Sequence, residues 1–159
     1  MKIIKRRKRL NRLFNIRNAT KELNILRSLE GYKRPFEIVG TYRLIDDGIR
    51  PEATVIIKTE DNETHEASTG VGPVDALANV LKKSLSSMFP VIQRIKLVDF
   101  SARVNDAKSG TSSSVEVSII FTDGKNIWSV SETAENINMA SFMALIDGFE
   151  YAISVLNQR

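Results

Sequence analysis

The sequence predicts an α+β fold in which two β-β-β-α units, related by a pseudo-twofold, follow a basic, partly helical N-terminal segment. Three observations lead to this prediction. Three strand-like segments followed by a helix-like segment occur twice along the chain. Residues 56–60 resemble residues 119–123, which lie 63 positions later. The favoured helix N-caps Gly72 and Asn136 lie 64 positions apart, so an internal duplication explains the pattern.

The N-terminal segment, residues 1–34, is distinguished by its charge. Eight of the 23 basic residues lie within the first 17 positions, and the first acidic residue is Glu22. The rest of the chain carries 15 basic and 19 acidic residues, so the pI near 9.4 describes this arm alone. We expect weak, salt-sensitive contact between the arm and polyanions. Apolar residues at weak helical spacing before Gly31 predict one or two short helices.

A domain is predicted over residues 35–159, and its first repeat covers residues 35–90. Its strands are expected at residues 36–45, 54–59 and 63–68. A helix is expected to begin after Gly72-Pro73 and to end before Pro90, with apolar side chains at helical spacing between them.

The second repeat is predicted over residues 94–156. Its strands are expected at residues 94–105, 115–121 and 127–133. Asp123-Gly124 is typical of a hairpin, and Asn136 caps a helix whose apolar residues form one stripe. One helix covers only part of the apolar face of a three-stranded sheet. We therefore expect the units to pack together and the chain to form a homodimer.

The composition excludes several classes of protein. There is no cysteine and only one histidine, so disulfides, zinc–thiolate sites and multi-histidine metal sites are excluded. His65 and the serines at positions 112–114 lack a catalytic partner at a recognisable spacing, so we expect no enzyme activity, no cofactor and no metal. There is no signal peptide and no run of about 18 apolar residues, which predicts a cytoplasmic protein without membrane contact.

The turn Gly70-Val71-Gly72, between a strand and a helix, is the strongest candidate binding motif. Two glycines let the backbone approach a ligand closely, and the N–H groups of a helix start attract a carboxylate. The alternative is a tight strand-to-helix turn with Pro73 at the first helical position. The third glycine of a dinucleotide fingerprint and the lysine of a P-loop are missing.

Several further motifs lie in the order found in one known family. They comprise residues 36–43, 67–77, 95–100 and 109–111, then Trp128 and residues 135–137, 140–141 and 144–147. Over residues 35–156 the chain resembles the regulatory domain of α-isopropylmalate synthases and citramalate synthases. The catalytic barrel of that family, with its Arg-Asp metal motif and His-x-His pair, has no counterpart here. The resemblance therefore implies a stand-alone regulatory domain.

This resemblance also implies a ligand and partners. In the family the domain dimerises and binds a branched-chain amino acid as a feedback inhibitor, in a pocket between the two repeats. Leucine or isoleucine is therefore the expected effector. The expected protein partners are a second copy of the chain and a separate catalytic synthase subunit.

The residues of the effector site follow from the resemblance position by position. The backbone of the amino acid would meet Gly70, Gly72, Val74 and Asp75. The apolar part of the pocket would include Leu97, Phe100, Val104, Thr111 and Ile137. Phe100 stands where the family usually has tyrosine. The second half-site departs further, with Glu132, Ala134 and Met139 in place of glycine, serine and glutamate.

A nucleic-acid-binding function is the alternative. A helix, three strands and a helix that starts at a Gly-x-Gly turn also suggest a double-stranded-RNA-binding module. That module needs lysines at the helix start to bind phosphate, whereas this helix begins with Pro73-Val74-Asp75. Only the basic arm favours this alternative.

Overall fold

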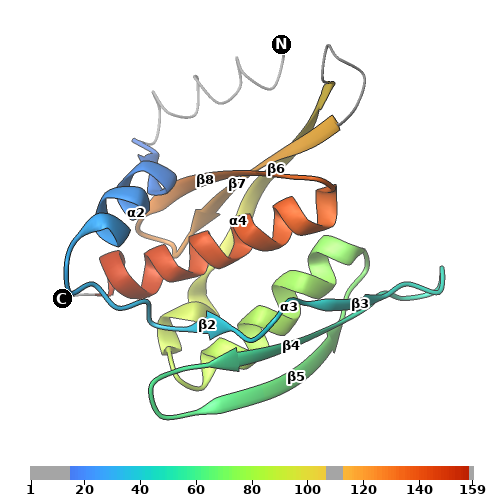
Figure 1. Cartoon of the computed structure of the whole chain (residues 1–159), viewed down its shortest axis with the longest axis horizontal. Helices are drawn as coiled ribbons and strands as arrows, with labels where there is room; N and C mark the ends of the chain where they lie inside the picture. The colour runs from blue at the N-terminus through green and yellow to red at the C-terminus, as the bar shows by residue number, and fades with distance from the viewer. Residues whose placement is uncertain (1–14, 107–112, 158–159) are drawn as a thin grey trace. The chain divides into compact units, whose positions relative to one another are not determined.

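The computed structural model describes residues 15–106 and 113–157, which form two compact units (Figure 1). Unit 1 contains residues 15–28 and 94–148, and unit 2 contains residues 29–93 and 149–157. The fold is α+β, as predicted, and a run of strands followed by a long helix occurs twice along the chain, with four strands in the first run and three in the second.

Unit 2 contains an antiparallel sheet with β4 (Glu52–Lys58) at its centre. β5 (Glu63–Thr69) pairs with one side of β4, and β2 (Glu37–Ile38) and β3 (Arg43–Ile45) pair with the other. The predicted first strand over residues 36–45 is therefore wrong as a single element. Gly40 adopts a φ of +73° between β2 and β3, a left-handed conformation that interrupts an extended ladder.

Helix α3 (Pro73–Ser86) packs against β4 and β5 in unit 2 (Figure 1). Alternate residues of β4 are buried, and α3 buries one stripe of apolar residues, because strand and helix side chains repeat every 2 and 3.6 positions. The buried residues are Ala53, Val55 and Ile57 from β4, and Ala76, Leu77, Val80, Leu81 and Leu85 from α3. Full burial of one leucine contributes about 2 kcal/mol, so burial of this stripe contributes several kcal/mol to the stability of unit 2.

Unit 1 contains a second antiparallel meander. β6 (Lys96–Asp106), β7 (Ser113–Thr122) and β8 (Ile127–Ala134) pair in chain order, with β7 at the centre. The Asp123-Gly124 turn joins β7 to β8 as predicted, with Gly124 at a φ of +96°. When β2 and β3 are counted together as one edge of β4, unit 2 has the same strand order as unit 1, which agrees with an internal duplication.

The N-terminal segment contributes to unit 1. β1 (Arg17–Asn18) pairs in parallel with β8, and α2 (Ala19–Ser28) packs against β8 with Ala19 and Leu23 fully buried. Thr20 Oγ1 accepts a hydrogen bond from the backbone N–H of Ser131 at 2.9 Å. The predicted helix is thus confirmed over α2, whereas the apolar residues at positions 10–14 lie outside the described residues. The boundary at residue 34 stays a prediction.

Helix α4 (Ile137–Tyr151) continues into a π-helical turn, η2 (Ala152–Leu156), and most of its side chains are buried. By length and composition alone this segment could cross a membrane, although Asp147 and Glu150 interrupt its apolar residues. However, 67% of it is buried inside the folded chain, as expected of a core helix.

A glycine inside α4 has a packing reason. A Cβ at Gly148 would lie 2.2 Å from the ring of Phe121 on β7. The indole Nε1 of Trp128 donates to the Gly148 carbonyl at 3.1 Å, and the rings of Trp128 and Phe121 stack with centroids 5.9 Å apart. Trp128 is fully buried.

Candidate functional site

Gly70 holds the β5–α3 turn close to the first turn of the helix. Its N–H donates to the Pro51 carbonyl at 3.1 Å. A Cβ at Gly70 would lie 2.3 Å from the backbone nitrogen of Ala76 and 2.7 Å from the carbonyl carbon of Asp75. This position therefore needs glycine for the fold itself, which supports the tight-turn interpretation for Gly70.

Gly72 is in a different environment. It is the N-cap of α3 with φ −135° and ψ 173°, an extended conformation that any residue can adopt. A Cβ at Gly72 would have no atom within 4 Å. Packing therefore does not require glycine here, and the space at the helix start is open. The N–H groups of Val74 and Asp75 belong to the first turn, where a helix leaves its donors without internal partners.

Asp75 stabilises the turn that precedes its own helix. Its Oδ2 accepts a hydrogen bond from the Val71 N–H at 2.8 Å, like the acidic residue of a capping box. The carboxylate also lies in the first turn of α3, where the helix dipole favours negative charge. One oxygen of Asp75 is thus engaged within the turn, and Oδ1 is the atom left for a cationic group.

The predicted apolar residues of unit 1 lie on β6 and at the start of α4. A β-bulge between Leu97 and Asp99 places Leu97 opposite Phe121 and Phe100 opposite Ile119. Because cross-strand partners share a face, Leu97, Phe100 and Val104 lie on one face of the sheet, the face of Phe121 that packs against α4. Plain alternation would place Val98 on the same face as Phe100, and the bulge places Leu97 there instead.

These residues are incompletely covered by the chain. The exposed fractions are 36% for Leu97, 38% for Phe100 and 62% for Val104, and Ile137 at the start of α4 is 42% exposed. Apolar side chains gathered along one strand are typical of a surface that another molecule covers. Thr111 lies outside the described residues.

A pair of carboxyl groups occupies the same face of unit 1. Glu132 on β8 lies opposite Val117 and is hydrogen-bonded to Asp147 on α4, and Arg27 Nη2 of α2 lies 2.8 Å from Asp147 Oδ1. Burial, the hydrogen bond to Asp147 and its negative charge raise the pKa of Glu132 to about 8, and Arg27 opposes this shift. Arg27 therefore offsets the negative charge of both Glu132 and Asp147, and one of these two carboxyl groups retains a proton near neutral pH.

Sequence reasoning missed this pair. It identified Glu132 only as a departure from the family's glycine. The proximity of Glu132 to Asp147 depends on the packing of α4 against β8, which no local spacing reveals. A protonated side chain thus stands at the position where the resemblance implies an open half-site.

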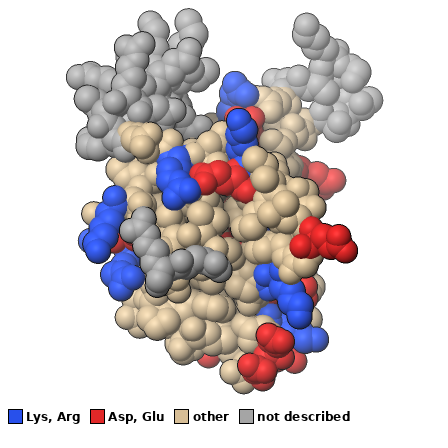
Figure 2. All heavy atoms as spheres, turned by 90° about the vertical axis from the view of Figure 1, so that its left-hand side faces the viewer, with Lys and Arg blue, Asp and Glu red and all other residues tan. Residues whose placement is uncertain are grey.

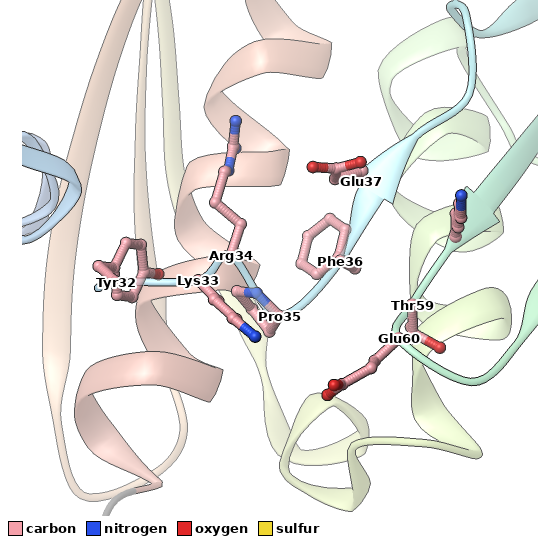
Figure 3. A pocket seen from close by; sticks show the side chains of 9 residues that line it. Tyr32, Lys33, Arg34, Pro35, Phe36, Glu37, Thr59 and Glu60 are labelled. Atoms are coloured by element: carbon pink, nitrogen blue, oxygen red, sulfur yellow. The ribbon is translucent and has the colours of Figure 1, made fainter. Parts of the chain in front are cut away.

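A pocket of about 640 Å³ lies elsewhere in unit 2, between the extended segment 32–37 and the β4–β5 turn (Figure 3). Lys33 and Glu60 point toward this space from opposite walls (Figure 3). Arg34 is engaged elsewhere, since its Nε donates to the fully buried Glu150 at 2.6 Å. The pocket shares no residue with the predicted effector site, and its lining mixes lysines with glutamates.

The distribution of charge gives little support to nucleic-acid binding. Basic and acidic side chains are interspersed over the face seen in Figure 2, without a continuous basic stripe among the described residues. On α3, Lys83 lies 3.4 Å from Glu66 and donates to the Ala67 carbonyl. Among residues 15–106 and 113–157, no three potential metal ligands come together.

Comparison with known proteins defines the family. The LeuA allosteric (dimerisation) domain matches residues 23–153. The chain therefore belongs to this domain family, which confirms the resemblance to the regulatory domain of the synthases.

Similar curated proteins are full-length synthases. The (R)-citramalate synthase of Geobacter sulfurreducens is 37% identical over 141 residues, which cover 85% of this chain and 26% of that enzyme. The (R)-citramalate synthase of Aquifex aeolicus is 36% identical over 146 residues, which cover 88% of this chain and 28% of the enzyme. The chain spans about a quarter of the length of these relatives.

Proposed function

We propose that this chain is a non-catalytic regulatory domain that binds a branched-chain amino acid and self-associates as a homodimer. The open helix start at Gly72 carries the proposal. A glycine that packing does not require leaves space beside unpartnered N–H groups, as a carboxylate site needs. Membership of an allosteric domain family supports a regulatory role for that site.

The ligand's charged end would bind at Gly70, Gly72, Val74 and Asp75. The N–H groups of the helix start would hold the carboxylate, and Asp75 Oδ1 would accept from the ammonium group. The aliphatic side chain would bind the apolar set Leu97, Phe100, Val104, Thr111 and Ile137. Burial of about four carbons at ~0.8 kcal/mol each contributes about 3 kcal/mol. The charged groups must supply the rest of the binding free energy, and we expect an affinity that is micromolar at best.

Regulation would follow from linkage. An effector that binds one arrangement of the dimer more tightly shifts the population toward that arrangement, and a bound catalytic partner responds to the shift. The catalytic partner is a synthase barrel, supplied by a separate subunit in the cytoplasm. The basic residues of positions 1–17 add a weak contact with polyanions.

Isothermal titration calorimetry with leucine, isoleucine and valine tests the effector proposal. We expect saturable heat with at least one of them, and a higher melting temperature at saturation. The D-enantiomer of the active ligand is the matched control, because it presents the same groups in a different arrangement. If none of the three amino acids gives heat or a thermal shift at millimolar concentration, the effector proposal is contradicted, and only the proposed self-association remains.

A further inference from the structure

The outer strands β5 and β6 of the two sheets differ in their hydrogen bonding. In unit 2, two carbonyls of β5 accept hydrogen bonds from side chains of α3: Lys83 Nζ bonds Ala67 at 3.1 Å and Asn79 Nδ2 bonds Thr69 at 3.0 Å. In unit 1, β6 is the outermost strand of the order β1-β8-β7-β6 and pairs only with β7 among the described residues. β6 thus presents a free edge 11 residues long.

Only part of this edge lacks the usual protection against association. Proteins shield long edge strands with charges, β-bulges, proline or a covering element. On β6 the bulge lies near the start of the strand, between Leu97 and Asp99, and the residues after it form a regular edge. On β6, Val98 is 53% exposed, Phe100 38% and Val104 62%, and only two charged residues lie between the bulge and residue 105. Such a strand is suited to receive a further strand.

We infer that a second copy of this chain pairs with β6 in an antiparallel ladder whose twofold axis passes through Ser101. This inference rests on the proposed self-association and assigns its surface. In such a ladder, the hydrogen-bonding groups of two directly opposite residues either both point toward the partner strand or both point away from it. Because this orientation alternates along a strand, the axis must pass through a pair of identical residues and not between two neighbouring positions. The candidate centres in the regular part of β6 are therefore few.

The charged residues of β6 distinguish between the possible positions of the twofold axis. With the axis at Ser101, Asp99 faces Arg103 of the second copy, and the symmetric pair repeats the contact. Phe100 then faces Ala102, so a large side chain meets a small one. With the axis at Ala102, Arg103 faces Ser101 and Asp99 faces Asn105, and with the axis at Arg103 the two arginines face each other. Opposite charges pair directly only at Ser101, and such pairs stabilise a ladder while like charges destabilise it.

The surrounding strand supports this arrangement. Arg103 lies opposite Glu116 on β7, and its Nη2 is 3.6 Å from Glu116 Oε2. Its side chain is 61% exposed, so it can contact a second carboxylate. In the paired form, Asp99 of one copy and Arg103 and Glu116 of the other would form a charge ladder across three strands.

Disulfide trapping tests the inference directly, because the chain has no cysteine of its own. Residues opposite each other in an antiparallel ladder have Cα atoms about 4.5–5.5 Å apart, within the range for a disulfide. We expect Ser101→Cys to form a covalent dimer rapidly on mild oxidation. Val104→Cys is the matched control: it is more exposed, but its two copies would be separated by about 20 Å along the ladder.

Charge reversal gives an independent readout. Asp99→Arg places like charges at both symmetric contacts, and we expect at least tenfold weaker dimerisation by sedimentation velocity. Adding Arg103→Asp restores opposite charges and should restore association. Glu63→Lys, on β5 of unit 2, is the control reversal and should leave the mass unchanged. Circular dichroism of each variant confirms that it is folded.

The outcomes separate this inference from the proposed function. One combination of results would contradict pairing through β6 and still agree with self-association of the chain. In that case the wild-type protein is dimeric, Asp99→Arg keeps the dimer mass, and Ser101→Cys cross-links no faster than Val104→Cys. A wild-type chain that is monomeric at every concentration would overturn both.

Discussion

The Arg27 guanidinium lies 2.8 Å from the Asp147 carboxylate and thereby joins α2 to α4 within unit 1. Asp147 is buried, and its second neighbour is the half-buried carboxyl of Glu132. A single cation cannot neutralise both carboxylates, so the folded unit retains a proton on the pair near neutral pH. The N-terminal helix is therefore linked to a proton-binding site.

The raised pKa of Glu132, about 8 against an ordinary value of 4.5, predicts a pH dependence of stability. Between these values the folded chain holds a proton that the unfolded chain releases, so this contribution is fully present below pH 4.5 and is lost as the pH rises through about 8. Glu132→Gln stays neutral at every pH. We expect it to gain on the order of 2 kcal/mol relative to wild type between pH 6 and 9, less than full linkage because the group is partly solvated.

Urea denaturation at pH 6, 7.5 and 9 measures this difference. Glu135→Gln, at an exposed neighbouring position, is the matched control and should show no such relative gain. Parallel stability curves for wild type and Glu132→Gln across this range would contradict the shared proton.

The sequence allowed the repeated strand order and both long helices to be predicted, because their apolar residues follow regular periods over seven or more positions. β1 could not be predicted, since two residues carry no period and its partner β8 lies 111 residues away in sequence. The bulge after Leu97 could not be predicted either, because no glycine or other typical bulge residue marks the position where the alternation changes. Within the candidate site, the motif identified Gly70 and Gly72 together, but only the packing of Ala76 distinguishes their roles.

That distinction gives a stability prediction. Gly70→Ala places a methyl group against the backbone of α3, which cannot move without displacing the helix start, so we expect a loss of about 2 kcal/mol or more. Gly72→Ala meets no atom within 4 Å and should change stability by less than about 1 kcal/mol. Thermal unfolding compares the two directly. Equal melting temperatures for both variants would show that the turn is not packed as described.

The N-terminal segment provides a truncation prediction. Removal of residues 1–14 leaves β1 and α2 intact, so the melting temperature should change little while heparin binding, and its steep dependence on salt, should fall. Removal of residues 1–28 also deletes the fully buried Leu23 and Ala19 and the Arg27–Asp147 ion pair. We expect that deletion to destabilise unit 1 by several kcal/mol. Similar melting temperatures for both truncations would refute a structural role for α2.

The effect of Gly72 on recognition of the ligand's carboxylate tests most directly whether an effector binds at the start of α3. Calorimetry would compare wild type, Gly72→Ala and Gly72→Val, each titrated with the active amino acid and with its alcohol analogue, which lacks the carboxylate. We predict that wild type binds the amino acid at least a hundredfold more tightly than the alcohol. Gly72→Val should lose binding while keeping its melting temperature, with Gly72→Ala in between. Equal affinity of wild type and Gly72→Val for the amino acid would contradict a carboxylate site at the start of α3.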